Sequence, residues 1–355
     1  MPFNSKRLSI ARKRRLLNKK GLALAIGVSE YSVLRYEAGK TVPADEKVAL
    51  IAAKLEFPVE FFFGEDVEEP PGDTASFRSQ TSMTAAIREA ALAAGSIGFL
   101  ISDWIEARFD LPPIIVPNLN FYSPEQASRA LREEWGLGEK PISNMIHLLE
   151  SKGARVFSLA ENSLKVNAYS LWRQDKPYVF LNTMKSAESS RLDAAHELGH
   201  LVLHQDGKTT GRMAEDEADR FASSFLMPKD DVLAELPYVH SLDQMIMKKT
   251  RWRVSVAALN YRLHKLNLTT EWQNRNFCIQ IARAGYRTNE PNPLPREMSV
   301  VWQKVLRTLW SERVTGADIA KALFLPAAEV EALVFGILGN PAPHPDAERR
   351  LSVVR

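Results

Sequence analysis

The segment HELGH, residues 196–200, constrains this chain more than any other feature, and it lies within the run RLDAAHELGHLVLH. On a helix, His196 and His200 project from the same face about one turn apart. Two imidazoles at that spacing can bind one tetrahedral zinc ion. The alternative is a buried helix that happens to carry two packed histidines, and the rest of the chain must decide between the two.

Glu197 follows the first histidine of this segment directly. From there its carboxylate can reach a water molecule held by the metal rather than the metal itself. Zinc lowers the pKa of such a water toward neutrality, and a glutamate that accepts the proton acts as the general base for attack on a peptide carbonyl. The pattern predicts a zinc-dependent hydrolase with Zn²⁺ as its cofactor.

A catalytic zinc site takes three protein ligands and leaves one position for water. The run MAEDEADRFASSFLMP offers the third ligand. Glu215 and Asp219 lie four residues apart, on one helical face, so one carboxylate can bind the metal while the other holds a ligand imidazole from behind. Glu217 competes for the role of ligand.

Four further residues receive a structural interpretation. His204 lies two turns after His196, about 12 Å along the axis and too far to share its metal, so we expect a structural or surface histidine. Tyr261 and Arg262 are candidates for stabilising an oxyanion, although a packed tyrosine and a surface arginine fit them better. The single cysteine, Cys278, excludes an internal disulfide.

The N-terminal part begins with a basic arm that indicates a polyanionic partner. The arm contains Lys6, Arg7, Arg12, Lys13, Arg14, Arg15, Lys19 and Lys20, all before the first acidic residue. Two short helices follow, over residues 20–26 and 30–38, joined by Gly27 and by Ser29 as the N-cap of the second. This is a helix-turn-helix plan.

Composition is that of an ordinary globular protein, with 45% hydrophobic and 25% charged residues among 355. The longest apolar stretch, residues 90–101, is too short to span a bilayer, so no membrane association is expected. The basic N-terminus is not followed by the apolar core of a signal peptide, so the sequence predicts a cytoplasmic protein.

Four segments are predicted along the chain. Residues 64–73 are acidic and proline-rich, which is typical of an extended linker without a core. Three short runs of β-branched and aromatic residues between 154 and 182 predict antiparallel strands. The fold class is therefore mainly α with a small α+β core. The expected boundaries are a helix-turn-helix domain at 1–64, a linker at 65–76, a zincin-like domain at 77–270 and a helical C-terminal segment at 271–355.

The C-terminal segment 315–338 superficially suggests a second helix-turn-helix. Lys321 is its only basic residue, which is too little positive charge for a phosphate-facing surface. We expect a packing element or a homodimer contact instead.

The stretch LALAIGVSEYSVLRYEAGKTVPADEKVALIAAKL, within residues 22–55, resembles the lambda-repressor-like (XRE) DNA-binding family. The resemblance implies that the helix after the turn enters the major groove of double-stranded DNA. The positions that it places at bases or phosphates are Lys19, Glu30, Tyr31, Ser32 and Arg35.

The motifs YVFLN, HELGHLVLH, EDEADRFASSFLMP and VSVAALNYRL, in this order, resemble the ImmA/IrrE zinc metallopeptidases over residues 140–266. This resemblance implies a gluzincin-like set with His196, His200 and Glu215 as ligands and Glu197 as the base. It also implies that the substrate is a regulatory protein, a repressor above all.

Two functions from different classes lead at this stage, and an antitoxin-like partner of a neighbouring protein is a third possibility. The first is a DNA-binding regulator with a zinc-dependent endopeptidase, which cuts a repressor in trans or its own acidic segment. The second is a transcription factor whose zincin domain is a sensor or dimerisation module without turnover. Glu197 separates them, because a binding module has no use for a base beside the metal.

Overall fold

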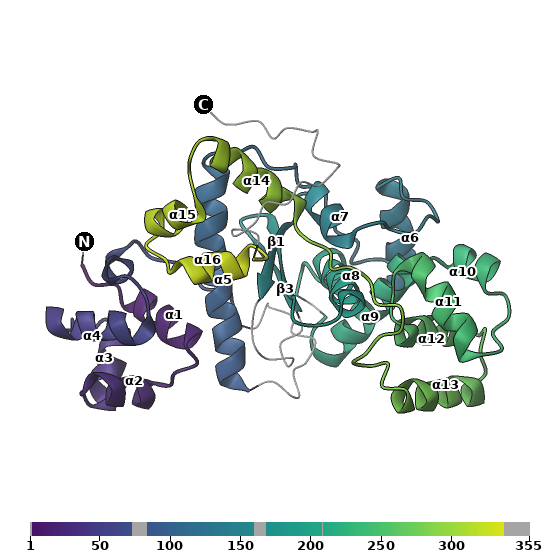
Figure 1. Ribbon diagram of the computed structural model, residues 1–355, viewed down its shortest axis with the longest axis horizontal. Helices are drawn as coiled ribbons and strands as arrows, with labels where there is room; N and C mark the ends of the chain where they lie inside the picture. The colour runs from purple at the N-terminus through teal and green to yellow at the C-terminus, as the bar shows by residue number, and fades with distance from the viewer. Residues whose placement is uncertain (1, 73–83, 160–167, 208, 337–355) are drawn as a thin grey trace. The chain divides into compact units, whose positions relative to one another are not determined.

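The structure, a computed structural model, describes residues 2–72, 84–159, 168–207 and 209–336. The described residues are mostly helical and include one small three-stranded sheet, as the sequence predicted (Figure 1). The chain divides into two compact units. Unit 1 contains residues 1–111, 157–166 and 299–355. Unit 2 contains residues 112–156 and 167–298.

Unit 1 is built from helices near both ends of the chain. They are α1 (Ser5–Arg14), α2 (Lys19–Ile26), α3 (Glu30–Glu37), α4 (Asp45–Leu55), the 3-10 helix η1 (Val59–Phe63), α5 (Ala85–Glu106), α14 (Val300–Ser311), α15 (Gly316–Ala322) and α16 (Ala327–Leu333). Gly27 ends α2 in the left-handed conformation with φ of 66°, and the Ser29 side chain caps α3 by accepting from the Ser32 amide.

The acidic segment after η1 is not free of the helices. Lys6 Nζ lies 2.6 Å from Asp66 Oδ2, and Lys13 Nζ lies 2.7 Å from Glu69 Oε2. Val67 is buried. The sequence predicted an extended segment without a core, and the part of it that is described, up to Gly72, packs along α1 because the two carry opposite charges.

The basic arm pairs mostly with acids of its own unit. Arg12 binds Glu37, and the guanidinium groups of Arg14 and Arg15 both bind Glu329 on α16, with Arg14 Nη2 2.9 Å from Glu329 Oε2. These three arginines are thus engaged in ion pairs within the unit, and the polyanionic partner of the basic arm stays a prediction. The local count of basic residues could not reveal partners that lie more than 300 residues away in the sequence.

Helix α5 is longer than its apolar stretch suggested, because it spans 22 residues. By length and composition it is the one described helix that could cross a membrane. Most of it is buried inside the protein, where α1 and α16 pack against it. A buried core helix of this kind also meets the criterion of length and composition for a membrane span.

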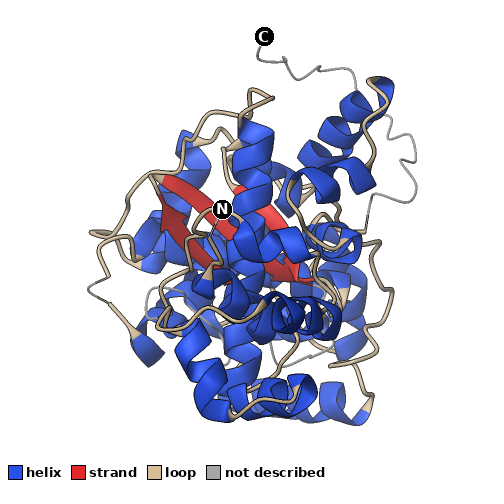
Figure 2. Cartoon of the chain, turned by 90° about the vertical axis from the view of Figure 1, so that its left-hand side faces the viewer, coloured by secondary structure: helices blue, strands red, loops and turns tan. Residues whose placement is uncertain are grey.

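Unit 2 holds the remaining helices and most of the sheet. The helices are α6 (Pro124–Glu134), α7 (Met145–Ser151), α8 (Ala187–Leu203), α9 (Gly211–Leu226), α10 (Lys229–Glu235), α11 (Leu242–Trp252), α12 (Val256–Lys265) and α13 (Glu271–Arg283). The strands are β1 (Arg155–Leu159), whose first two residues belong to this unit, β2 (Ala168–Arg173) and β3 (Lys176–Asn182), in the order β1–β3–β2. Figure 2 shows the strands in red among the blue helices.

Strands β2 and β3 form a tight antiparallel hairpin, with Ala168 opposite Leu181 and Arg173 opposite Lys176. The two turn residues, Gln174 and Asp175, have φ of 50° and 60°. Positive φ at both central positions is the type I′ geometry whose twist matches that of paired strands.

Helix α8 packs on β2 and β3 with one side and on α9 with another. Gly199 makes the second contact close: a Cβ there would lie 3.1 Å from Phe221 Cδ1 and 3.2 Å from Ala218 Cα. The glycine of HELGH thus lets α9 approach the helix that carries the histidines.

Candidate metal centre

Three side chains from α8 and α9 converge in unit 2. His196 and His200 extend from α8, and Glu215 extends from α9 between them. His196 Nε2 lies 3.4 Å from Glu215 Oε2, and His200 Nε2 lies 3.5 Å from Glu215 Oε1. One ligand atom from each of the three lies within 4.8 Å of the others. The structure thus brings together the three residues predicted as ligands.

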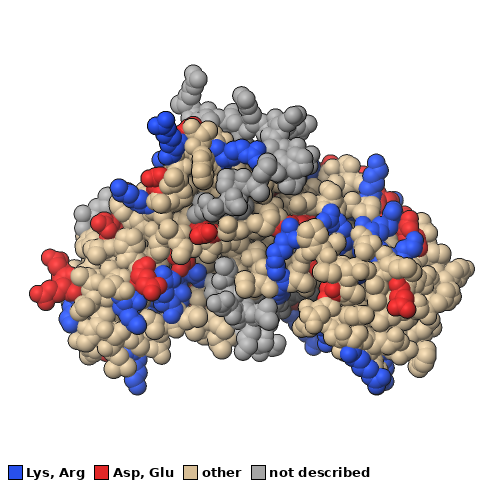
Figure 3. Space-filling view, in the orientation of Figure 1, with Lys and Arg blue, Asp and Glu red and all other residues tan. Residues whose placement is uncertain are grey.

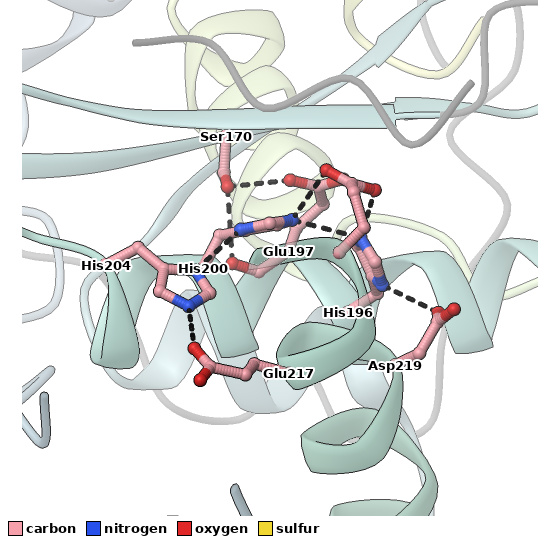
Figure 4. A network of polar contacts seen from close by, with 8 residues as sticks. Ser170, His196, Glu197, His200, His204, Glu217 and Asp219 are labelled. Carbon is pink, nitrogen blue, oxygen red and sulfur yellow. Dashed lines mark hydrogen bonds and ion pairs between the residues drawn. The ribbon is translucent and has the colours of Figure 1, made fainter. Parts of the chain in front are cut away.

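The hydrogen bonding within this cluster fits a cation at its centre. The Nε2 atoms of His196 and His200 face each other at 3.0 Å, while the Nδ1 atoms contact Asp219 and His204 (Figure 4). Among the described residues, Glu215 Oε2 is buried and accepts no hydrogen bond. Two imidazole nitrogens beside a buried carboxylate oxygen form a nitrogen and oxygen donor set that suits zinc.

Helix α9 places its acids on two sides of its buried stripe. Asp219 Oδ1 lies 2.9 Å from Nδ1 of His196, on the same flank as Glu215. Glu217 projects about 200° around the helix from Glu215, because each residue turns the chain by about 100°. This geometry separates Glu217 from the cluster of His196, His200 and Glu215, and Glu217 contacts His204 instead.

Burial and neighbouring charges set the protonation of the ligands. Burial lowers the pKa of His200 to about 4, against the opposing effect of Glu215. Burial would raise the pKa of Glu215, but the contacts with His196 and His200 outweigh it and hold that pKa well below its usual value. At neutral pH the cluster therefore offers a neutral imidazole and a carboxylate, which are the ligating forms.

Glu197 points from α8 toward the sheet rather than into the ligand set. Its Oε2 accepts a hydrogen bond from the Ser170 hydroxyl of β2 at 2.7 Å, and its buried Oε1 accepts none from the described residues (Figure 4). Burial raises the pKa of Glu197 to about 8, although His196 and Ser170 act in the other direction. A carboxyl pKa raised in this way is typical of catalytic acids and bases.

Sequence reasoning missed two features of the site. Ser170 orients Glu197, and its only sequence signal is a hydroxyl within the otherwise apolar strand AYSLWR. The side chain of His204 is only 6% exposed, which fits the expectation of a structural or surface histidine, but its contact with His200 was not predicted. The signal was its spacing, because His204 follows His200 by the same four residues that separate the ligands.

The two oxyanion candidates lie in different surroundings. Arg262 is fully buried rather than on the surface, because it binds Glu125 and the Met227 carbonyl. Tyr261 is half-buried, and its pKa is raised by burial and then by the charge of Asp219. This coupling places Tyr261 near the acid that supports His196.

The residues predicted to contact DNA lie on and beside α3. Val33 is the only buried residue of this helix. Glu30 and Tyr31 are exposed, while Ser32 is half-buried and bonded to the Ser29 cap. Arg35 donates to Thr41 and lies over the Tyr31 ring. Lys19 Nζ, at the start of α2, lies 3.9 Å from Glu37 Oε2, whose side chain is 8% exposed.

One protein family matches the part of the chain that contains the metal cluster. Residues 149–264 match the peptidase family M78, described as the IrrE N-terminal-like domain. This stretch contains the whole metal cluster, and it supports the resemblance to ImmA/IrrE peptidases there. The match does not extend to the helices of residues 1–64. No curated protein matches the chain.

Proposed function

We propose that the chain is a zinc-dependent endopeptidase joined to a DNA-binding domain, and that it cleaves a regulatory protein of the repressor type. The observation that carries the peptidase part is the pair of Nε2 atoms 3.0 Å apart beside Glu215. One ligand atom from each of the three residues lies within 4.8 Å of the others, and the buried Glu215 Oε2 accepts no hydrogen bond from the described residues, so a bound cation would complete the arrangement.

His196, His200 and Glu215 would hold the metal, and zinc is the best fit for two imidazoles and one carboxylate. When bound, zinc acts as a Lewis acid that makes water acidic near neutral pH and polarises a carbonyl. Asp219 accepts the Nδ1 proton of His196, which makes Nε2 the ligating nitrogen of that ring.

Glu197 would be the general base. The Ser170 hydroxyl fixes one carboxylate oxygen, so the other oxygen, Oε1, is the atom left to take and return a proton. Burial raises the pKa of Glu197 above the ordinary value of a carboxyl group, which brings it closer to working pH. The peptide bond would be broken by water, with Glu197 delivering the proton to the leaving amine.

The experiment pairs metal analysis with cleavage. Purified protein would be assayed for bound zinc and then incubated with helix-turn-helix repressors from the same genome, with a chelator as the control. We expect one zinc per chain and a cleavage that stops with the chelator. Zinc binding without cleavage of any repressor, together with a cellular phenotype that persists in Glu197→Gln, would support a sensor without turnover instead.

The DNA-binding part is supported by the surface of α3. Tyr31 and Leu34 are 66% and 43% exposed on a helix that buries only Val33. The helix follows a left-handed glycine turn and a serine cap, which is the local geometry of a helix-turn-helix. Acidic and basic side chains are intermixed over α1–α4 on the face in Figure 3, so α3 rather than a basic face is the proposed contact.

A fluorescence anisotropy titration tests this contact. The probe is a DNA duplex from the region upstream of the chain's own gene, measured at two salt concentrations. We expect Tyr31→Ala to weaken binding, whereas Tyr238→Ala, which alters a tyrosine 72% exposed in unit 2, should not. Equal binding by both variants would contradict a role for α3.

Cleavage in trans fits the structure better than self-cleavage within residues 64–72. A protease cleft takes an extended, accessible backbone. Here Val67 is buried, and Asp66 and Glu69 pair with lysines of α1. Mass spectrometry of the zinc-loaded protein should show the intact chain, and a fragment ending between residues 64 and 72 would reverse this choice.

A further inference from the structure

A third histidine, His204, and a further acid, Glu217, extend the metal cluster beyond its ligands. His204 Nδ1 lies 2.9 Å from His200 Nδ1, and His204 Nε2 lies 2.9 Å from Glu217 Oε2 (Figure 4). The side chain of His204 is 6% exposed and that of Glu217 is 32% exposed. Glu217, His204 and His200 therefore form a continuous line of contacts that ends at a predicted metal ligand.

Only one arrangement of protons lets this line coexist with a metal. If His200 binds through Nε2, that nitrogen has no proton, so Nδ1 of the neutral ring must carry one. The Nδ1 proton of His200 then donates to Nδ1 of His204, which must be bare. His204 is consequently protonated on Nε2, and it donates to the carboxylate of Glu217.

We infer that His204 and Glu217 are positioning residues, which fix the tautomer and ring orientation of His200 for the metal. The inference rests on the proposed metal site. Under this inference, an acid of α9 supports the orientation of each ligand histidine. For His196 the acid is Asp219 in direct contact, and for His200 it is Glu217 acting through His204.

The opposite flanks of α9 explain why an intervening imidazole is used. Asp219 lies on the flank that faces His196, whereas Glu217 lies on the other flank and contacts the end of α8 instead. His204 is the C-cap residue of α8, and its ring spans the space between His200 and Glu217. Hydrogen-bond partners behind a metal-binding histidine typically contribute about 10–100-fold to metal affinity.

The test measures zinc affinity of the full chain by competition with a chromophoric chelator. His204→Phe keeps a ring but removes the acceptor for His200, and we expect about 10–100-fold weaker zinc binding. His204→Asn places a side-chain oxygen near the position of Nδ1 and should restore most of the affinity. Glu217→Ala should give an intermediate loss of zinc affinity. Because Glu217 is partly exposed, this substitution should leave the fold intact.

The chain supplies a matched control in the same unit. His264 Nε2 lies 3.3 Å from Glu271 Oε2, a histidine and glutamate pair between α12 and α13. His264→Phe and Glu271→Ala should leave zinc affinity unchanged. A loss as large as that of His204→Phe would mean that the effect is a general one on folding.

Nitrogen NMR of histidine-labelled protein with zinc gives a second readout that a merely structural role would not move. We expect His200 as the Nδ1–H tautomer and His204 as the Nε2–H tautomer. A His204 ring protonated on Nδ1 in the zinc-bound protein would overturn the inference, as would full affinity in both His204→Phe and Glu217→Ala. If the unaltered protein binds no zinc at all, the proposed metal site itself has failed.

Discussion

Two buried polar clusters of this molecule differ in whether their polar groups find hydrogen-bond or ion-pair partners within the cluster. In unit 1, two guanidinium groups, from Arg14 and Arg15, bind both oxygens of Glu329. In unit 2, one oxygen of Glu215 is buried beside the Nε2 atoms of His196 and His200 and accepts no hydrogen bond from the described residues. The first cluster is complete and holds helices together, whereas the second leaves a buried carboxylate oxygen for which a cation would be a partner. Complementarity, more than burial, distinguishes a structural cluster from a site.

The largest expected effect concerns the base beside the incomplete cluster. Glu197→Gln should slow cleavage of a repressor substrate by about 10²–10⁴-fold, because the amide cannot take a proton. Zinc content should stay the same, since Glu197 is not in the ligand set. Activity assays with metal analysis measure both. Unchanged cleavage would assign the base to another residue.

Removing the acid of the complete cluster should cost stability instead. Glu329→Ala leaves two arginines beside a buried cavity, and loss of one partner from a buried ion pair costs about 3–5 kcal/mol of unfolding free energy. Urea denaturation measures this, with Glu331→Ala as the control because Glu331 is exposed on the same helix. In the metal-free protein, Glu215→Ala should cost much less, and an equal cost would erase the contrast between the clusters.

Zinc should stabilise the folded protein only through the cluster of His196, His200 and Glu215. At a free zinc concentration 100 times the dissociation constant, the linkage relation gives about 2.7 kcal/mol of added stability. Calorimetry should show this increase for the unaltered protein and for Glu329→Ala, but not for His196→Ala. An increase that survives in His196→Ala would place the metal elsewhere.

The close approach of α8 and α9 gives a smaller effect. Gly199→Ala adds a methyl group 3.1 Å from Phe221 and 3.2 Å from Ala218, so the helices must separate by a few tenths of an ångström. Overpacking of this kind costs about 1–3 kcal/mol, and the displacement of Glu215 should also weaken zinc binding. Thermal unfolding and zinc titration measure the two. Tighter zinc binding would contradict the expectation that the close approach of α8 and α9 favours zinc binding.

The smallest expected effect is the pH dependence of the complete cluster. Burial would raise the pKa of Glu329, but Arg14 and Arg15 outweigh it and hold that pKa below the ordinary 4.5. Because the folded-state pKa is lowered, the stabilisation is present above about pH 4.5 and is lost as pH falls through the folded value. The difference in unfolding free energy between the unaltered protein and Glu329→Ala should therefore narrow in acid. A difference that stays constant with pH would show that the ion pairs of Glu329 do not contribute to stability.

Local patterns predicted the elements well. Helix α4 has the expected bounds, Asp45–Leu55, and α3 ends one residue before the expectation. All three strands coincide with the predicted runs, except that β3 begins one residue earlier, at Lys176. These features depend on periodicity, caps and turn residues, which are neighbours in the sequence. The spacing of His196 and His200 predicted their convergence for the same reason.

Long-range pairing could not be predicted in this way. Ser170 reaches Glu197 across 27 residues, and Arg14 reaches Glu329 across 315. No local pattern announces such partners, because they meet only when helices and strands pack. The contact of Glu217 with His204 was not predicted, since it depends on which flank of α9 faces α8, and that is decided by the packing of the whole helix.

The contact with Glu329 also limits how the chain can be divided. The arginines of the first helix and the acid of the last described helix neutralise one another, so residues 1–64 expressed alone would display two guanidinium groups that the full chain keeps covered. Such a fragment would carry extra positive charge near α1 and bind polyanions more avidly than the intact protein does. Measurements of nucleic-acid affinity on the isolated fragment would therefore overstate the affinity of the whole.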